Sequence, residues 1–262
     1  MCHLPKLFSK WCDCEIEEDG NKQLIRYVEC EGGRNAVLAK LPERIRDHYI
    51  GQIELSSILA ELDFHETAEV IKELYPTSLA IKSGDLGEIL AVESCEEELG
   101  FRIPIRRFRY KDHRNMSMRG DDLIGVEIDD DRLSLLKGEA KSRQNLGTAT
   151  IEDARAALNG ESGRPSAHAL IFVGRILIRN GDASDKVLGA ALLREAKSRA
   201  VPKRRISHVL FTLSGTPAWN PLQTDFENAD GERPQYIVNV RIPDHSAFIT
   251  TMFEEAGKLG DD

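Results

Sequence analysis

The distribution of apolar and polar residues predicts a chain in which strands and helices follow one another. Short apolar segments interleaved with charged residues indicate strands, and longer segments of helix-forming residues indicate helices. The first core helix should begin at Ser83–Asp85 and run to about Glu98, with Gly100 ending it. We predict strands over 101–109, 122–128, 132–141, 206–213 and 236–242, and further helices over 151–159, 166–178, 185–199 and 245–258. This order is typical of an α/β core.

The first 76 residues have a different pattern. We predict a hairpin within residues 22–40, with one strand over 24–28, a turn at Gly32–Gly33 and a short second strand over 36–38. Two amphipathic helices should follow, around 43–50 and over 55–74. No repeat or low-complexity linker separates residues 1–76 from residues 77–262, so we expect the smaller N-terminal region to pack on the rest.

Two carboxylates lie at adjacent ends of the strands predicted over 122–128 and 132–141. Asp122 starts the first strand, and Glu139 and Lys141 end the second. Residues i and i+2 of a strand share a face, so Glu139 and Lys141 project together. A hairpin turning at Asp129–Asp131 would bring Asp122 beside Glu139. Adjacent carboxylates repel unless a cation lies between them, and such hard oxygen donors suit Mg²⁺ or Mn²⁺.

Lys141 beside this pair of carboxylates indicates phosphodiester hydrolysis, because a lysine could orient a metal-bound water toward the phosphorus atom and help to deprotonate it. The tripeptide Glu-x-Lys is common, and this chain carries Glu-Ala-Lys-Ser-Arg twice, at 139–143 and at 195–199. The second copy lies in a predicted helix, where Glu195 and Lys197 diverge by about 200°. We therefore expect the second copy on a solvated helix surface and assign the site to the first.

Composition limits the class of protein. The 262 residues carry a net charge of −9, with 41% hydrophobic and 30% charged residues, and no segment approaches the roughly 20 apolar residues of a membrane span. Five cysteines without a framework spacing fit a reducing compartment. The segment Met1–Phe8 lacks the apolar core of a secretion signal. We expect a cytoplasmic protein that does not enter a membrane.

Positive charge is concentrated in residues 102–119 despite the negative total. This segment leads directly to Asp122, where a phosphate backbone would have to lie. Strand alternation would place Arg107 and Arg109 opposite Phe108 and Tyr110, although a solvated strand edge would look the same. The expected nucleic-acid contacts are Arg107, Arg109, Lys111, Arg114 and Arg119, with Lys203–Arg205 as a second candidate.

Taken together, these features resemble the PD-(D/E)xK nuclease superfamily. The strings Gly84–Glu88, Arg106–Asp112, Gly120–Gly125 and Gly138–Lys141 are similar to those of HamA, the family of nuclease subunits in Hachiman anti-phage systems, over about residues 80–260. The resemblance implies a restriction-endonuclease-like core, a mixed central sheet flanked by helices, in residues 77–262, and a small α+β region in residues 1–76. It also implies DNA cleavage together with a superfamily 2 helicase partner, HamB.

The resemblance further implies roles for single residues. Asp122 and Glu139 would hold Mg²⁺ or Mn²⁺, with the Ala140 carbonyl as a further donor, and Lys141 would activate water. Glu88 would orient the metal site, with Glu93 as the alternative on the same helix. The superfamily's Pro-Asp is absent, since Asp121 precedes Asp122. Either aspartate could therefore bind metal, and we choose Asp122 because it immediately precedes the apolar strand.

Two other functions compete with a helicase-dependent nuclease. One is a catalytically silent nuclease fold that clamps DNA and docks a helicase, which the intact Asp122, Glu139 and Lys141 set argues against. The other is an autonomous Mrr-like restriction nuclease, which the absence of a recognisable winged helix in residues 1–76 argues against. The sequence leaves open whether the substrate is DNA or RNA.

Overall fold

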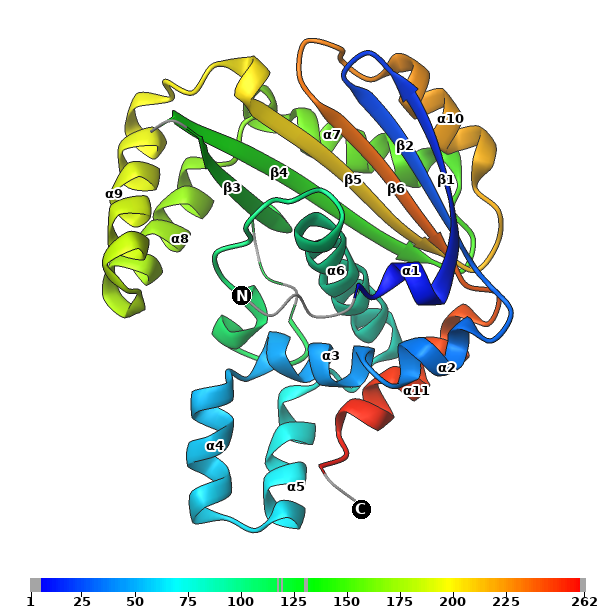
Figure 1. Ribbon diagram of the computed structural model, residues 1–262, viewed down its shortest axis with the longest axis vertical. Helices are drawn as coiled ribbons and strands as arrows, with labels where there is room; N and C mark the ends of the chain where they lie inside the picture. Colours follow the sequence, from blue (N-terminus) through cyan, green and yellow to red (C-terminus); the bar gives the residue numbers. More distant parts are fainter. Residues whose placement is uncertain (1–5, 117, 119, 130–131, 260–262) are drawn as a thin grey trace.

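A computed structural model of the chain describes residues 6–116, 118, 120–129 and 132–259, which form one mixed β-sheet flanked by helices (Figure 1). The strand order is β1-β2-β6-β5-β4-β3. Strands β2, β6, β5 and β4 are parallel, and the edge pairs β1/β2 and β4/β3 are antiparallel. The strands are β1 (Cys12–Asp19), β2 (Lys22–Glu29), β3 (Leu123–Asp129), β4 (Arg132–Arg143), β5 (Ile206–Ser214) and β6 (Gln235–Arg241).

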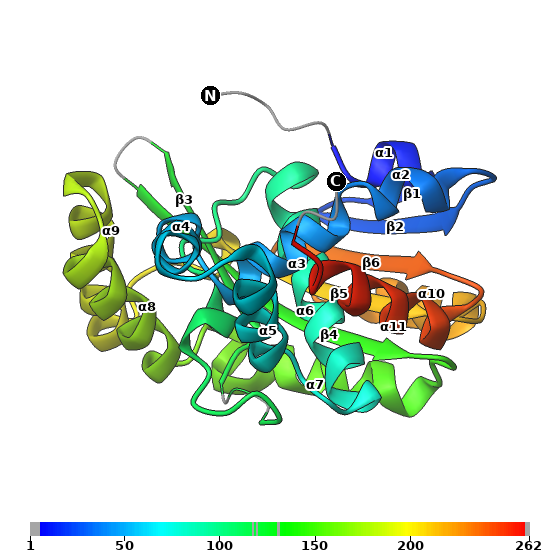
Figure 2. The same ribbon diagram turned by 90° about the horizontal axis from the view of Figure 1, so that it is seen from below.

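Helices cover both faces of the sheet (Figures 1 and 2). Helices α1, α2, α3, α6 and α11 lie on one face, and α7 and α10 lie on the other. Helices α8 and α9 form a hairpin against β3 and β4, and α4 and α5 form a second hairpin that extends from the body. No helix in the described ranges is long and apolar enough to cross a membrane. The helices are α1 (Phe8–Trp11), α2 (Gly33–Leu38), α3 (Leu41–Tyr49), α4 (Gln52–Glu61), α5 (Phe64–Leu74), α6 (Leu79–Glu97), α7 (Thr148–Gly163), α8 (Ala167–Asn180), α9 (Ala183–Ser198), α10 (Trp219–Asn228) and α11 (His245–Ala256), with short 3-10 helices η1 (Arg107–Tyr110) and η2 (Lys203–Arg205).

Strand β5 lies at the centre of the core, and every residue along it is buried. Phe211 packs in the cluster with α6 and α11, whereas its neighbour Leu210 packs with α7 and α10. Burial on both faces is expected of a parallel strand with helices on each side. The prediction of a strand over 206–213 is confirmed.

The α/β class and most predicted elements are also confirmed. The strands predicted over 122–128, 132–141 and 236–242 are β3, β4 and β6, and the helix predicted around 43–50 is α3. Strands β3 and β4 pair as an antiparallel hairpin with Leu123 opposite Gly138, which brings the start of β3 to Glu139 as predicted. The predicted core helices correspond to α6, α7, α8, α9 and α11. The predicted start of the first one is wrong, because α6 begins at Leu79 and Ser83–Asp85 lie inside the helix.

The strand predicted over 101–109 is wrong. Arg102 makes an isolated bridge to Val126 of β3, and the chain then turns into η1. Pro104 cannot donate to a strand ladder. The arginines instead pair with acids on neighbouring helices, Arg106 with Glu96 and Arg109 with Asp47. The strand-face argument for Arg107 and Arg109 therefore fails.

The predicted N-terminal elements need two corrections. Residues 36–38 belong to α2, and β2 pairs instead with the upstream strand β1. The helix predicted over 55–74 is interrupted, because Asp63 caps a new helix by accepting a hydrogen bond from the Glu66 N–H. Residues 6–76, the described part of the N-terminal region, do pack on the rest of the chain, since β2 pairs with β6 in the same sheet.

Candidate active site

The β3–β4 hairpin brings Asp122, Glu139 and Lys141 together. The ladder ends with Leu123 opposite Gly138, and the Asp122 Oδ2 then accepts a hydrogen bond from the Ala140 N–H at 2.9 Å. The carboxylate thus replaces a backbone partner just beyond the end of β3. Lys141 Nζ donates to Glu139 Oε1 at 2.5 Å, as two residues on one strand face can.

Glu88 comes to the same region from α6. The helix lies close to β4 because Gly87 has no side chain, and a Cβ there would be 3.2 Å from the Cβ of Ser142. A hydrogen bond of 2.8 Å between the Ser83 and Ser142 hydroxyls ties the preceding turn of α6 to the same strand residue. Glu88 follows Gly87 directly, so close packing of α6 on β4 sets its position.

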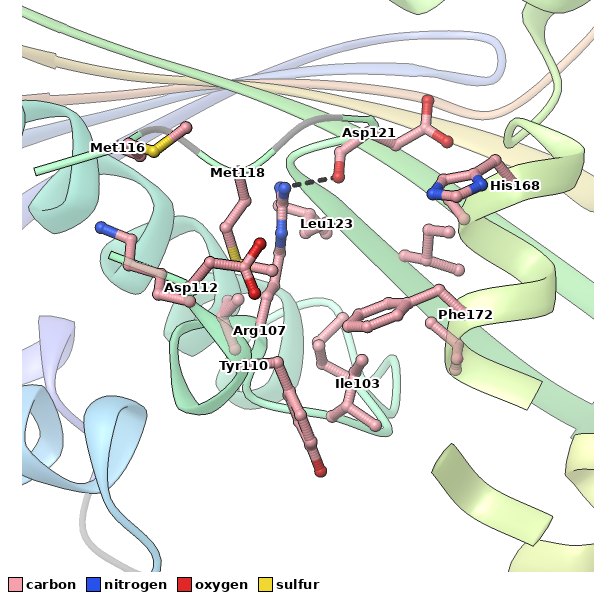
Figure 3. A pocket seen from close by; sticks show the side chains of 16 residues that line it. Ile103, Arg107, Tyr110, Asp112, Met116, Met118, Asp121, Leu123, His168 and Phe172 are labelled. Carbon is pink, nitrogen blue, oxygen red and sulfur yellow. Dashed lines mark hydrogen bonds between the residues drawn. The ribbon is translucent and has the colours of Figure 1, made fainter. Parts of the chain in front are cut away.

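Arg107 links Glu88 to Asp122. Its Nη1 lies 3.4 Å from Glu88 Oε2 and 3.7 Å from Asp122 Oδ1, and it donates a hydrogen bond of 2.7 Å to the Asp121 carbonyl oxygen (Figure 3). The guanidinium is therefore a counter-charge shared by two of the predicted catalytic carboxylates.

The position of Arg107 depends on a second acid of α6. Lys111 forms an ion pair with Asp85, and the Tyr49 hydroxyl donates to the same carboxylate. This anchors the segment that carries Arg107 to the turn of α6 before Glu88. We did not predict this arrangement. Its signal in the sequence is the i, i+3 spacing of Asp85 and Glu88, which places both on one helix face.

The three carboxylate side chains are only 14–18% exposed, and this partial burial raises their pKa values. Burial raises the pKa of Glu88 well above its usual value, and the charge of Asp122 raises it further, against Arg107. Burial is also the main reason why the pKa values of Asp122 and Glu139 are raised, and Asp122 adds to the shift at Glu139. Lys141 opposes both of these shifts. Positive charge added here would stabilise the ionised forms.

The two aspartates have different surroundings. Asp121 Oδ2 accepts a hydrogen bond from the Ser166 N–H at 2.8 Å, and Asp121 Oδ1 lies 3.6 Å from Lys137 Nζ. Its carboxylate therefore ties β4 to the start of α8. Asp122, in contrast, lies with Glu139 and near Glu88. This placement agrees with the choice of Asp122 as the predicted ligand.

Glu93, the alternative to Glu88, belongs to another cluster. Its carboxylate pairs with Arg44, and its Oε1 lies 3.0 Å from His48 Nε2. These contacts join α6 to α3 and explain its burial without a role at the site.

The donor chemistry of the candidate site suits a hard divalent cation. Glu88, Asp122 and Glu139 offer carboxylate oxygens, and the Ala140 N–H donates a hydrogen bond to Asp122. In the ranges that the structure describes, however, no three acidic, histidine or cysteine side chains already form a ready-made ligand set. Arg107 and Lys141 supply the positive charge instead.

The basic residues predicted to bind phosphates are paired with acids. Besides the contacts of Arg107 and Lys111 above, Arg109 Nη2 lies 2.8 Å from Asp47 Oδ1, and Arg114 Nη1 lies 2.6 Å from Glu73 Oε2. Arg119 lies outside the described residues. Phosphate binding by this segment stays a prediction, and it would require these pairs to exchange partners.

The second Glu-Ala-Lys-Ser-Arg copy is not a solvated surface throughout, contrary to our expectation. It is helical, in α9, and Lys197 is exposed. Glu195 is only 5% exposed, because it pairs with Arg164 and accepts hydrogen bonds from the N–H groups of Ala200 and Val201. Glu195 therefore holds the end of α9 in place.

A cavity of about 370 Å³ lies beside Arg107 and Asp121 (Figure 3), and Glu88, Asp122 and Glu139 are not among its lining residues. Its walls are mostly apolar, and Tyr110 and Phe172 meet edge to face there with centroids 5.7 Å apart. Arg107 and Asp121 belong to its polar lining. A ligand in this cavity could therefore contact the guanidinium that also contacts Glu88 and Asp122.

Comparison with known proteins places the whole described core in one family. The family model described as HamA matches residues 5–256. The Hachiman protein HamA of Bacillus cereus is 22% identical over 256 residues, which span 95% of this chain and 90% of that relative. The matched range contains both the β3–β4 hairpin and α6. The chain belongs to the HamA family.

Proposed function

We propose that this protein is a metal-dependent DNA endonuclease of the PD-(D/E)xK type. The observation that supports the proposal is the meeting of three carboxylates and a lysine, with Asp122 fixed on Ala140 between Glu139 of β4 and the Arg107-linked Glu88 of α6. Three carboxylates that are each at most 18% exposed, and close enough for the charge of Asp122 to raise the pKa values of Glu88 and Glu139, are costly for a fold unless cations compensate them.

The residues divide the work of phosphodiester hydrolysis. Asp122 and Glu139, with the Ala140 carbonyl, would hold Mg²⁺ or Mn²⁺, which when bound would polarise the scissile phosphate and stabilise the developing charge. Lys141 would orient the attacking water and help to deprotonate it. The hydrogen bond that Lys141 donates to Glu139 holds the ammonium group in place for this role. Glu88 would position the metal-binding side of the site, and Arg107 could move from the carboxylates to the phosphate.

The biological setting follows from the family. The Bacillus cereus relative is named a Hachiman protein, and the resemblance in sequence implies anti-phage defence beside a superfamily 2 helicase, HamB. We propose the same setting here, with this chain as the nuclease effector and the helicase bringing it to DNA.

One experiment tests the activity. The purified protein, alone and with its helicase, is incubated with plasmid DNA in Mg²⁺ and in EDTA. We expect cleavage in Mg²⁺ only, and a loss of about a hundredfold or more in Glu139→Gln and in Lys141→Ala without loss of fold. Lys197→Ala, in the exposed part of the helical copy, is the matched control and should cleave normally. Cleavage that persists in EDTA, or in both site variants, would refute the proposal.

A silent nuclease fold remains the second candidate, because Arg107 and Lys141 already provide two positive charges to the three carboxylates. Such internal neutralisation could make a metal unnecessary. Mn²⁺ binding followed by electron paramagnetic resonance separates the two functions. If the protein is a nuclease, it should bind Mn²⁺, and Glu139→Gln should abolish that binding. If it is a silent module, Glu139→Gln should leave the Mn²⁺ signal unchanged, and the protein should still bind the helicase.

A further inference from the structure

A groove lined by arginines lies away from the carboxylates. It has a volume of about 580 Å³ and runs between the start of β4, the last turns of α9 and η2. Three separate elements therefore bring positive charge to one hollow in the surface. The arginines that line the groove are Arg132, Arg194, Arg204 and Arg205.

These arginines differ from those of the 102–114 segment, which are paired with acids. Arg194 and Arg204 are exposed, and neither has a carboxylate partner among the described residues. The acid that lines the groove, Glu195, is buried and occupied by Arg164 and by backbone N–H groups. As far as the described residues go, the guanidinium groups of Arg194 and Arg204 are thus available to an external anion.

Neutral oxygen atoms hold Arg205 in place, so no carboxylate of the described residues neutralises its charge. Its Nε donates to the Leu133 carbonyl at 3.2 Å and to Ser134 Oγ at 3.1 Å, and its Nη2 donates to the Arg132 carbonyl at 2.7 Å. All three acceptors are neutral. They fix η2 against β4, so the groove is ordered before any ligand arrives.

We infer that this groove binds the phosphate backbone of the DNA substrate at a distance from the cleaved bond. Arginine forks match phosphate oxygens well. The argument rests on Arg194, Arg204 and Arg205, because Arg132 directly follows the acidic run Asp129–Asp131 in the sequence.

The distance along β4 suggests what the groove does for the reaction. Six residues separate Leu133, in the groove, from Glu139, which is about 20 Å in an extended strand. Phosphates follow one another at about 3.4 Å along a strand of DNA, so the groove would hold DNA about six nucleotides from the scissile bond. It should therefore contribute to binding and not to the chemical step. This inference rests on the proposed nuclease function only for the identity of the substrate.

The test is DNA binding by the full-length protein in EDTA. Anisotropy of a labelled duplex of about 30 base pairs, long enough to span the site and the groove, is measured over a salt series for wild type and for Arg194→Gln/Arg204→Gln. Loss of two phosphate contacts should flatten the log–log salt dependence by about two units and weaken binding by about tenfold or more near 0.1 M salt. In Mg²⁺, KM should rise while kcat is retained.

The control is Arg175→Gln/Arg179→Gln, on α8. These arginines are also exposed, have no carboxylate partner in the described ranges, and do not line the groove. The control removes the same charge and should leave the salt dependence as in wild type. Equal effects of the two double variants would overturn the inference, because total charge alone would then explain binding.

Other results separate this inference from the proposed activity. If wild type cleaves DNA but the groove variant keeps the wild-type salt slope, the groove is not on the DNA path and the inference fails. If the groove variant binds DNA normally but loses the helicase, the groove docks a protein, and the inference also fails. If DNA binding depends on the groove but no condition gives cleavage, the inference stands and the nuclease proposal falls.

Discussion

Adjacent residues of the same type take different roles when their partners differ, as Asp121 and Asp122 demonstrate. The carboxylate of Asp121 is used by Ser166 and Lys137, which hold α8 and β4 together. Asp122 gives one oxygen to the Ala140 N–H and lies 3.7 Å from Arg107 through the other. The same side chain therefore supports the fold at position 121 and faces the other acids at position 122.

This difference predicts opposite results for two asparagine substitutions. Asp122→Asn should raise the Mg²⁺ concentration needed for cleavage, because hard cations are held mainly by carboxylate charge, and should change stability little. Asp121→Asn should keep the wild-type Mg²⁺ requirement but lower the melting temperature. Mg²⁺ titrations of cleavage and thermal melts of both variants provide the measurements. Matching titrations for the two variants would remove Asp122 from the ligand set.

Arg107 predicts a link between metal and stability. In Arg107→Ala, Glu88 and Asp122 lose their shared counter-charge, which should cost about 2 kcal/mol without metal. Millimolar Mg²⁺ should then raise the melting temperature of the variant more than that of wild type, because a divalent cation replaces the lost guanidinium. Arg109→Ala, which breaks the pair with Asp47, is the control and should show no such difference. If Mg²⁺ raised the melting temperature of Arg107→Ala and of wild type equally, Mg²⁺ and the Arg107 guanidinium would not neutralise the same carboxylates, and the prediction would be wrong.

At the scale of elements, the buried contact between α3 and α6 supports the helix that carries Glu88. Glu93 and His48 are each 3% exposed, and Arg44 pairs with the same carboxylate. Burial opposes ionisation of Glu93, but the hydrogen bond from His48 and the charge of Arg44 outweigh it and lower the pKa of Glu93 to about 2. Burial also lowers the pKa of His48, so its ring is neutral at pH 7 and donates an N–H.

The pKa of Glu93 gives a prediction with a defined sign. The value in the folded protein lies below the unfolded value of about 4.3, so ionised Glu93 stabilises the fold above that pH. This contribution, on the order of 3 kcal/mol, is lost as the pH falls from about 4.5 toward 2. Urea denaturation should show Glu93→Gln to be less stable at pH 7 and less sensitive to acid in this window.

An exposed ion pair is the control for Glu93. Glu69 pairs with Lys72 on the surface of α5, where both side chains are at least half exposed. Exposed pairs contribute little, so Glu69→Gln should follow the wild-type stability curve over the whole pH range. If Glu93→Gln lost stability in acid as steeply as wild type, the source of acid sensitivity would lie in other carboxylates.

The sequence predicted those elements whose environment their own residues determine. Strand β5 has the apolar core Val209–Phe211, and the β3–β4 hairpin consists of two mainly apolar segments on either side of its turn. The placement of Asp122 near Glu139 therefore followed from strand geometry. Strand β1 was missed because it is an edge strand with acidic residues and an exposed Ile16. Helix α10 was also missed, since Pro221 stands in its first turn.

The predictions failed where long-range charge pairs decide the conformation. The alternating residues of 101–109 resemble a strand, but Arg106 and Arg109 are drawn to Glu96 and Asp47 on different helices. No local pattern reports such partners. For the same reason, the sequence identified Glu139 and Lys141 but not the contacts of Arg107 with Glu88 and Asp122.

At the scale of the whole molecule, the first residues of the chain complete the sheet that carries the candidate site. Strand β2 hydrogen-bonds to β6 from Lys22 to Val28, and Trp11 stacks on Phe248 of α11. Helix α3 packs on α11 and α6 as well. The smaller N-terminal region is therefore integrated with the core, and residues 77–262 alone would leave one edge of β6 without its partner.

We therefore predict that residues 77–262 do not fold alone. Phe8 and Trp11 are fully buried, and losing a buried aromatic side chain typically costs about 3–5 kcal/mol. Two such losses, together with the unpaired edge of β6, are comparable to the whole stability of a domain, about 5–15 kcal/mol. Circular dichroism during urea denaturation should show no cooperative transition for this fragment. Co-expression with residues 1–76 should restore one, because β2 pairs with β6 through hydrogen bonds and not through chain continuity. A cooperative transition of residues 77–262 alone would instead establish them as an independent domain.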